Sequence, residues 1–144
     1  MPGNLELIHT SENSPRFNMP YSPAVKVRSG FPVYLAGVTA APVYHSHPHR
    51  PAEFADIPED AEQQAEMCIE NLLVVLNAAG ATLADLVELT RYVVDLDRNQ
   101  DAINRVLGRH LGEHRPATTT VEVVRLATDP KLILELKAVA VSTE

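Results

Sequence analysis

The chain has 144 residues, of which 45% are hydrophobic and 22% charged, and its formal net charge is −7. This length predicts one domain with one hydrophobic core. The acidic balance repels phosphate, so nucleic acids and anionic membrane surfaces are not expected partners. The single cysteine, Cys68, excludes an intrachain disulfide and a cysteine-based zinc site, and we expect a reducing, cytoplasmic location. No export signal or membrane-spanning run is evident.

The first part of the chain predicts strands followed by a long loop. Residues 1–20 are polar and are expected to form an N-terminal arm or a ragged first strand, before a single domain at 21–144. Segments 24–27 and 32–38 alternate like strands, and Gly30 between them favours a hairpin. The next 22 or so residues contain Pro42, Pro48, Pro51 and Pro58, which exclude regular structure.

The rest of the chain alternates helices and strands. An amphipathic stripe predicts a helix over 58–79, with Asp56 as its cap and Gly80 at its end. Segment 86–96 is β-branched and apolar, as expected for a central strand buried on both faces. A shorter helix is predicted over 99–112, and strands over 118–126 and 131–141. The order β-β-α-β-α-β-β predicts an α+β fold, with two helices on one face of one sheet.

The last predicted strand has two unlike faces. Leu132, Leu134, Leu136, Ala138 and Ala140 form an apolar face that we expect under the helices. The other face mixes apolar and charged residues, and a monomer would leave its Val139 and Val141 in water. This face is therefore expected to close against another subunit.

Several segments together resemble the Rid family, also called YjgF/YER057c/UK114. They are Tyr21–Val25, Val33–Gly37, Glu70–Leu72 with Leu76 and Ala79–Ala81, Thr90–Asp95, Arg115–Ala117, Val121–Leu126 and Leu134–Leu136. The resemblance implies a chorismate-mutase-like α+β subunit and a homotrimeric barrel with three clefts between subunits. It also implies hydrolysis of reactive enamines and imines to ketones and ammonia, with no cofactor.

Two positions depart from the pattern of the family's imine hydrolases. Those members have an arginine after Pro-Ala, whose guanidinium grips the substrate carboxylate, and this chain has Thr118 there. Ala36 stands where serine is common. Glu135 matches the glutamate that orients and activates the attacking water, so the resemblance implies that Glu135 is the catalytic residue.

Two interpretations follow for the cleft. In the first, the protein hydrolyses C=N bonds but binds the substrate through residues other than the family arginine. Thr118, Thr119 and Thr120 would then bind a polar substrate beside Tyr21 and Ala36, with charge from Arg91, Arg115 or Arg50. In the second, the cleft binds a small ligand without turnover, because losing a charge-assisted hydrogen-bond pair costs a few kcal/mol. A ribonuclease is the third class, and the acidic charge argues against it.

The histidines in the long loop invite a metal hypothesis, since imidazoles bind zinc and related ions. His45, His47 and His49 alternate in an irregular segment, which is not a recognised ligand pattern, so no metal is predicted. We expect a polar surface loop. The alternative is that the loop covers the cleft and that His45 or His47 contacts a substrate.

Four other polar or reactive residues stand out in the pattern. His110 and His114 flank the end of the shorter helix and are expected to be structural. Cys68 lies on the apolar stripe and is expected to fill the core rather than act as a nucleophile. Asn71 could bond across the sheet or cap the solvent side of the apolar stripe, and the sequence leaves both open.

Overall fold

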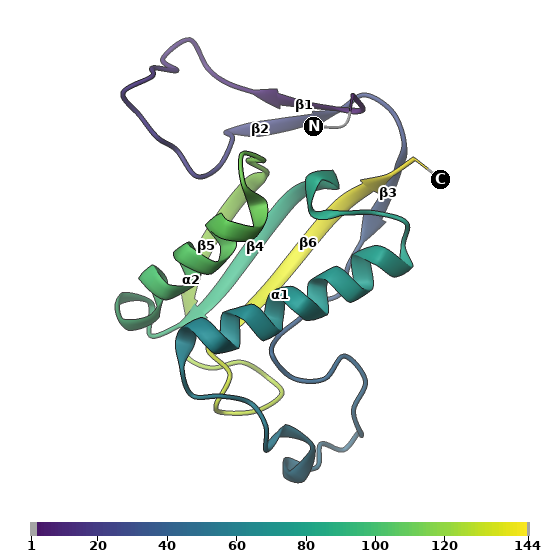
Figure 1. The fold of residues 1–144 in the computed structure, drawn as a ribbon, viewed down its shortest axis with the longest axis vertical. Helices are drawn as coiled ribbons and strands as arrows, with labels where there is room; N and C mark the ends of the chain where they lie inside the picture. Colours follow the sequence, from purple (N-terminus) through teal and green to yellow (C-terminus); the bar gives the residue numbers. More distant parts are fainter. Residues whose placement is uncertain (1–2, 144) are drawn as a thin grey trace.

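Four strands form the central sheet, and two long helices lie across one of its faces (Figure 1). The computed structural model describes residues 3–143. The strand order is β3-β6-β4-β5, with β4 antiparallel to β6 and parallel to β5, while β1 and β2 form a separate antiparallel pair. The elements are β1 Leu5–Ile8, β2 Ala24–Val27, β3 Phe31–Tyr34, η1 Pro51–Phe54, α1 Ala61–Ala78, η2 Leu83–Asp85, β4 Leu86–Val94, α2 Leu96–Leu111, β5 Ala117–Val123 and β6 Leu134–Ser142.

The predicted α+β class and the two helices on one sheet face are confirmed, but the predicted hairpin is wrong. Strand β2 pairs with β1, and β3 pairs with β6 instead of turning back on β2. Gly30 has φ 104°, and a Cβ there would lie 2.4 Å from a methyl carbon of Val141, so a residue with a side chain would clash. The glycine therefore marks a close approach to β6 rather than a hairpin turn.

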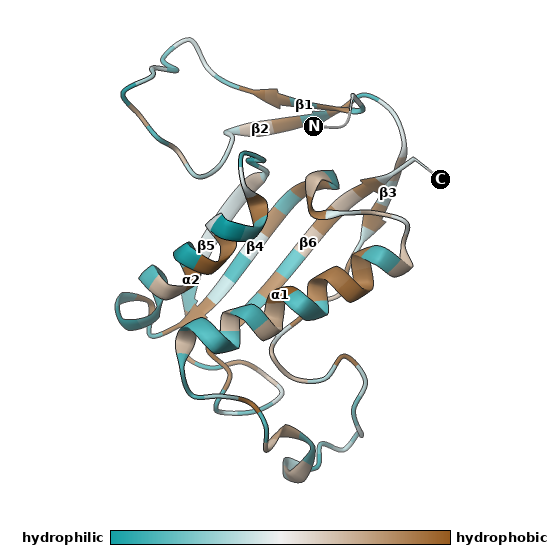
Figure 2. Cartoon of the chain, in the orientation of Figure 1, coloured by the Kyte–Doolittle hydropathy of each residue, from teal (hydrophilic) through white to brown (hydrophobic). Residues whose placement is uncertain are grey.

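Helix α1 has the predicted apolar stripe and a different start. Cys68, Leu72 and Leu76 on that stripe are at most 1% exposed, and Figure 2 shows the later turns of the helix as hydrophobic. The cap is Asp60, whose carboxylate accepts a hydrogen bond from the Gln63 backbone N–H at 3.0 Å. Asp56 lies too far upstream to cap a helix that begins at Ala61.

Strand β6 has the predicted apolar face against the helices. Leu134, Leu136, Ala138 and Ala140 are at most 1% exposed and pack in the main core. Two details differ from the prediction. Leu132 precedes the strand and packs in a second cluster with Phe54, Ile57 and Leu126. Val141, on the other face, is 1% exposed because the segment around Gly30 covers it, so a single chain does not leave it in water.

Strand β4 is central, as predicted, yet only one of its faces is fully buried. Leu89, Arg91 and Val93 are buried under the helices, whereas Thr90 and Tyr92 on the other face are half-buried. That other face is the open face of the sheet. It also carries Tyr34, which is 75% exposed beside its β6 neighbour Val139. Neither long helix, in residues 3–143, is long and apolar enough to cross a membrane.

Candidate functional site

A large cavity lies between α2 and the β4–β5 edge of the sheet. Its volume is about 590 Å³, and we call it the Thr118 cavity. The apolar part of its wall comes from Leu89, Leu107 and Leu111. The polar part consists of Tyr21, Arg91, Gln100, Asn104, Arg115, Thr118, Thr119 and Thr120. The structure thus gathers most of the predicted substrate-binding residues in one place.

The strand register explains why Thr118 and Arg91 share this cavity. Thr118 lies beside Leu89 and Thr120 beside Arg91 in the parallel β4–β5 pair. Paired residues of neighbouring strands point to the same face. Because Leu89 and Arg91 are buried on the helix-covered face, the side chains of Thr118 and Thr120 line the space under α2.

Arg91 is the buried cation of the Thr118 cavity. It is 8% exposed, and one guanidinium nitrogen donates to Asn104 Oδ1 at 2.8 Å. Its Nε–H has no hydrogen-bond partner among the described residues. Burial lowers the pKa of the Arg91 guanidinium, but arginine remains protonated in proteins. An arginine that lines a polar cavity is suited to bind an anionic group such as a carboxylate.

Arg115 and Thr118 are already engaged in contacts with the backbone. The Arg115 guanidinium donates to the carbonyls of Met19 and Gly112, which ties the N-terminal segment to the end of α2. The Thr118 hydroxyl donates to the Pro116 carbonyl at 3.0 Å, so its oxygen is left as an acceptor. Of the cations predicted as replacements for the family arginine, Arg91 is therefore the one best placed. Arg50, in the loop before η1, is not among the residues that line this cavity.

Glu135 lines a second cavity, of about 160 Å³, near the β3 side of the sheet. We call it the Glu135 cavity. Ala36, His45 and Asn71 are among the residues that line it, together with Thr128 from the loop before β6. The predicted residues are thus divided: Ala36, His45 and Glu135 lie here, and the threonines and Arg91 lie in the other cavity.

The absence of a side chain at Gly37 leaves space for the Glu135 carboxylate. A Cβ at position 37 would lie 1.9 Å from Glu135 Oε2, so any side chain there would displace the carboxylate. Glu135 is half-buried, and burial raises the pKa of its carboxyl group above the ordinary value of 4.5. A carboxylate with a raised pKa is a better proton acceptor and donor near neutral pH, which is what a general base needs.

Asn71 on α1 holds the wall of the Glu135 cavity in place. Its amide donates to the carbonyls of Thr39 and Ala41, at 2.7 and 2.8 Å, so Asn71 binds the loop after β3, a contact that neither alternative from the sequence had named. Cys68 is fully buried, donates to the Val38 carbonyl at 3.3 Å, and has a thiol pKa raised by burial. It fills the core as predicted.

The remaining histidines divide into structural and loop groups. His110 contacts a Glu66 carboxylate oxygen at 2.8 Å, and His114 contacts the Leu86 carbonyl at 2.8 Å, as expected for structural residues. His47 and His49 are exposed and lie beside His45. Sequence reasoning missed Asn104 and Gln100 of α2, whose spacing of four residues places both on the helix face toward β4 and was the available signal.

Comparison with known proteins agrees with this fold. The family model described as Endoribonuclease L-PSP matches residues 11–142. A RutC family protein of Pyrococcus abyssi is 35% identical over 135 residues, which cover 94% of this chain and 95% of the relative. TdcF of Escherichia coli K12, whose name provisionally calls it a reactive intermediate deaminase, is 35% identical over 89 residues, 60% of this chain and 67% of the relative.

A solved structure gives the same result for the fold. The Rid family protein YyfB of Yersinia pestis superposes with a TM-score of 0.75 at 29% identity, covering 96% of this chain and 98% of that one. The α+β fold of this chain is therefore that of a known class of small proteins. The chain belongs to the Rid family, also called YjgF/YER057c/UK114.

Proposed function

We propose that the chain assembles head to tail into a trimer, in which the Glu135 cavity of one subunit meets the Thr118 cavity of the next. The observation that supports this is the separation of the two cavities within one chain. Glu135 lies beside Tyr92 on the open face, while Arg91 lies beside Leu136 on the helix-covered face. The Thr118 cavity is at the β5 edge and the Glu135 cavity near the β3 edge. A closed head-to-tail ring brings unlike edges together.

The cleft formed in this way would hydrolyse a C=N bond next to a carboxylate. The carboxylate would bind Arg91, with Thr118 and Thr120 as further polar contacts. Glu135 would accept a proton from a water molecule as the water oxygen bonds to the imine carbon, and would return that proton to the nitrogen. The resulting carbinolamine hydroxyl then loses its proton to Glu135, which passes that proton to the nitrogen as the C–N bond breaks, and a ketone and ammonia are released. The relative named as a reactive intermediate deaminase supports this reaction class.

A small-ligand binder without turnover is the second candidate. Thr118 replaces the cation that imine hydrolases use, and Arg91 reaches the cavity from a different strand. The acidic net charge argues against RNA as the substrate, although the family model carries a ribonuclease name. The single buried cysteine is compatible with our expectation of a cytoplasmic location.

Mixing two inactive variants tests whether the cleft is shared. Glu135→Gln and Arg91→Gln chains should each release little ammonia from a panel of imines made from small and large amino acids. Refolded together in equal amounts, they should regain about a quarter of the wild-type rate, since a quarter of the clefts then contain both native groups. No recovery in well-folded mixed trimers would place both groups in one subunit's site. The small-ligand binder would be favoured if the wild type hydrolyses no imine and its melting temperature rises when 2-oxo acids are added.

A further inference from the structure

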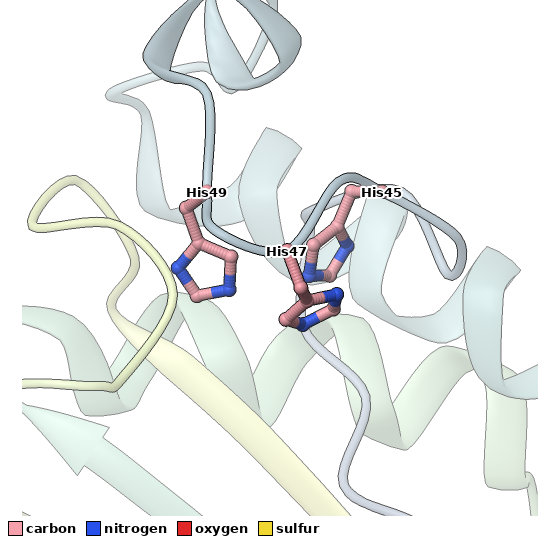
Figure 3. Close-up of side chains that lie close together, drawn as sticks. All are labelled: His45, His47 and His49. Atoms are coloured by element: carbon pink, nitrogen blue, oxygen red, sulfur yellow. The ribbon is translucent and has the colours of Figure 1, made fainter.

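We infer that His45, His47 and His49 form a binding site for one divalent transition-metal ion of the zinc type. Their spacing did not predict such a site, but the structure brings the three rings together on one side of the loop (Figure 3). The candidate ligand nitrogens all lie within 4.8 Å of one another. The ring centroids of neighbouring pairs are 4.8 to 5.2 Å apart.

The distances require only a small movement of the rings on metal binding. Zinc binds imidazole nitrogen at about 2.0–2.1 Å in a tetrahedral arrangement, which places two ligand nitrogens roughly 3.3 Å apart. The observed separations are within reach of that value through side-chain rotation, because His47 and His49 are exposed. Three histidines leave a fourth coordination position for solvent or a ligand.

The hydrogen bond of His45 leaves its other nitrogen free for a metal. His45 Nδ1 lies 2.7 Å from the Pro42 carbonyl oxygen. A carbonyl oxygen can only accept, so Nδ1 carries the proton and Nε2 keeps its lone pair. A ring N–H held by a backbone carbonyl is the usual support of a metal-binding histidine.

The surroundings support two of the three rings and place a carboxylate in the same loop. Phe54 is 1% exposed and packs edge-on against His45 and His49, at centroid distances of 5.3 and 5.7 Å. The Glu53 carboxylate accepts from the Ser46 backbone N–H, which lies between two of the histidines. The hydrogen bonds from Ser46, followed by the nearby charge of Arg50, lower the pKa of the Glu53 carboxyl group. An ionised carboxylate in the loop adds to the attraction of a cation.

The proposed metal site adjoins the Glu135 cavity, because His45 contributes to both. The inference nevertheless does not depend on the proposed hydrolysis. It concerns the binding of a metal ion by loop side chains, and it can be measured without any substrate. Glu135→Gln should leave metal binding unchanged, which separates the two proposals.

The test is titration of the chelator-treated, full-length protein with zinc chloride in a calorimeter. We expect one zinc ion per chain and a melting temperature that rises with zinc concentration. His47→Gln and His49→Gln should each weaken binding by more than about tenfold, since losing even an outer-shell partner costs that much. His9→Gln, which changes an exposed histidine outside the cluster, is the matched control and should bind as the wild type does.

Three results would overturn the inference. The first is a wild type that binds no zinc. The second is a His47→Gln variant that binds as tightly as the wild type. The third is equal loss of binding in His9→Gln, which would show adventitious binding to surface histidines only. Because His47 and His49 are exposed, loss of binding in their variants cannot be ascribed to unfolding if the circular dichroism spectra match.

Discussion

Glu135 and Thr118 lie on opposite faces of the same four-stranded sheet. Glu135 is the β6 neighbour of Tyr92, and Thr118 is the β5 neighbour of Leu89, three positions earlier on β4. Leu89 is buried under the helices, whereas Tyr92 is on the open face. A reaction that uses both residues is therefore expected in the proposed cleft between two subunits.

The protein should be a trimer in solution, with a mass of about three times 15.8 kDa by light scattering. Val139→Glu should dissociate it, since this change puts a charge beside Tyr34 on the open face. Val74→Glu is the matched control, because Val74 is 63% exposed on α1, away from the sheet. A wild type that is a monomer at micromolar concentration would remove the shared cleft and with it the proposed hydrolysis.

Arg91 already donates to Asn104 and should hold the carboxylate of a small substrate only weakly. The wild type should therefore hydrolyse 2-iminopropanoate and 2-aminoacrylate poorly, and Thr118→Arg should raise that rate by about two decades. The added guanidinium would grip the substrate carboxylate through two charge-assisted hydrogen bonds in the transition state. Ammonia release measures the gain. Adding Glu135→Gln to this variant should abolish it, because the water loses its base. If Thr118→Arg remains a trimer and gains nothing, Glu135 is not placed for hydrolysis.

Gly37→Ala should move the Glu135 carboxylate with a small loss of stability. The added Cβ would meet mainly Glu135 atoms, and a flexible side chain can turn away, so we expect a cost of only about 1 kcal/mol. Imine hydrolysis should fall much more than the melting temperature. In a Glu135→Ala background the same glycine change should cost less, as a double-mutant cycle would show. If Gly37→Ala lowers the free energy of unfolding equally in both backgrounds, the added Cβ clashes with atoms other than those of Glu135.

Glu135→Gln should stabilise the fold at about pH 7, because the folded chain partly buries a charge that glutamine lacks. The raised folded pKa means that the folded state binds a proton more tightly than the unfolded state does. Stability should therefore fall as the pH rises from 4.5 through the folded pKa, and the advantage of glutamine should shrink toward acidic pH. Thermal melts at several pH values measure this. A variant less stable than the wild type at about pH 7 would contradict the prediction.

Periodicity was enough to predict the helices and the central strands. The stripe through Cys68 and Leu72 and the alternation of Leu134 and Leu136 each reflect burial against one layer, and the structure confirms both. The hairpin prediction was wrong because the partner of a strand is set by the tertiary fold and not by the strand's own sequence. The sequence around Gly30 is typical of a hairpin turn, but in the structure the glycine allows the backbone to approach Val141 closely.

Most residues that line the two cavities were named from the sequence, although Gln100 and Asn104 were missed and the arrangement was not predicted. The resemblance pointed to Thr118 and Glu135, but the face that Thr118 takes depends on its register against Leu89, which nothing in its own strand encodes. The convergence of His45, His47 and His49 was also hidden, because it depends on how an irregular loop folds around Phe54.

Cys68 gives the protein an internal reporter of its own opening. It is the one cysteine in the chain, it is 0% exposed, and it lies between α1 and the sheet. A thiol-specific reagent reaches it only when α1 separates from the strands, so the rate of labelling reports how often that separation occurs. The free energy that holds the long helix to the sheet can thus be measured in the unmodified protein, and each variant above can be compared on that scale.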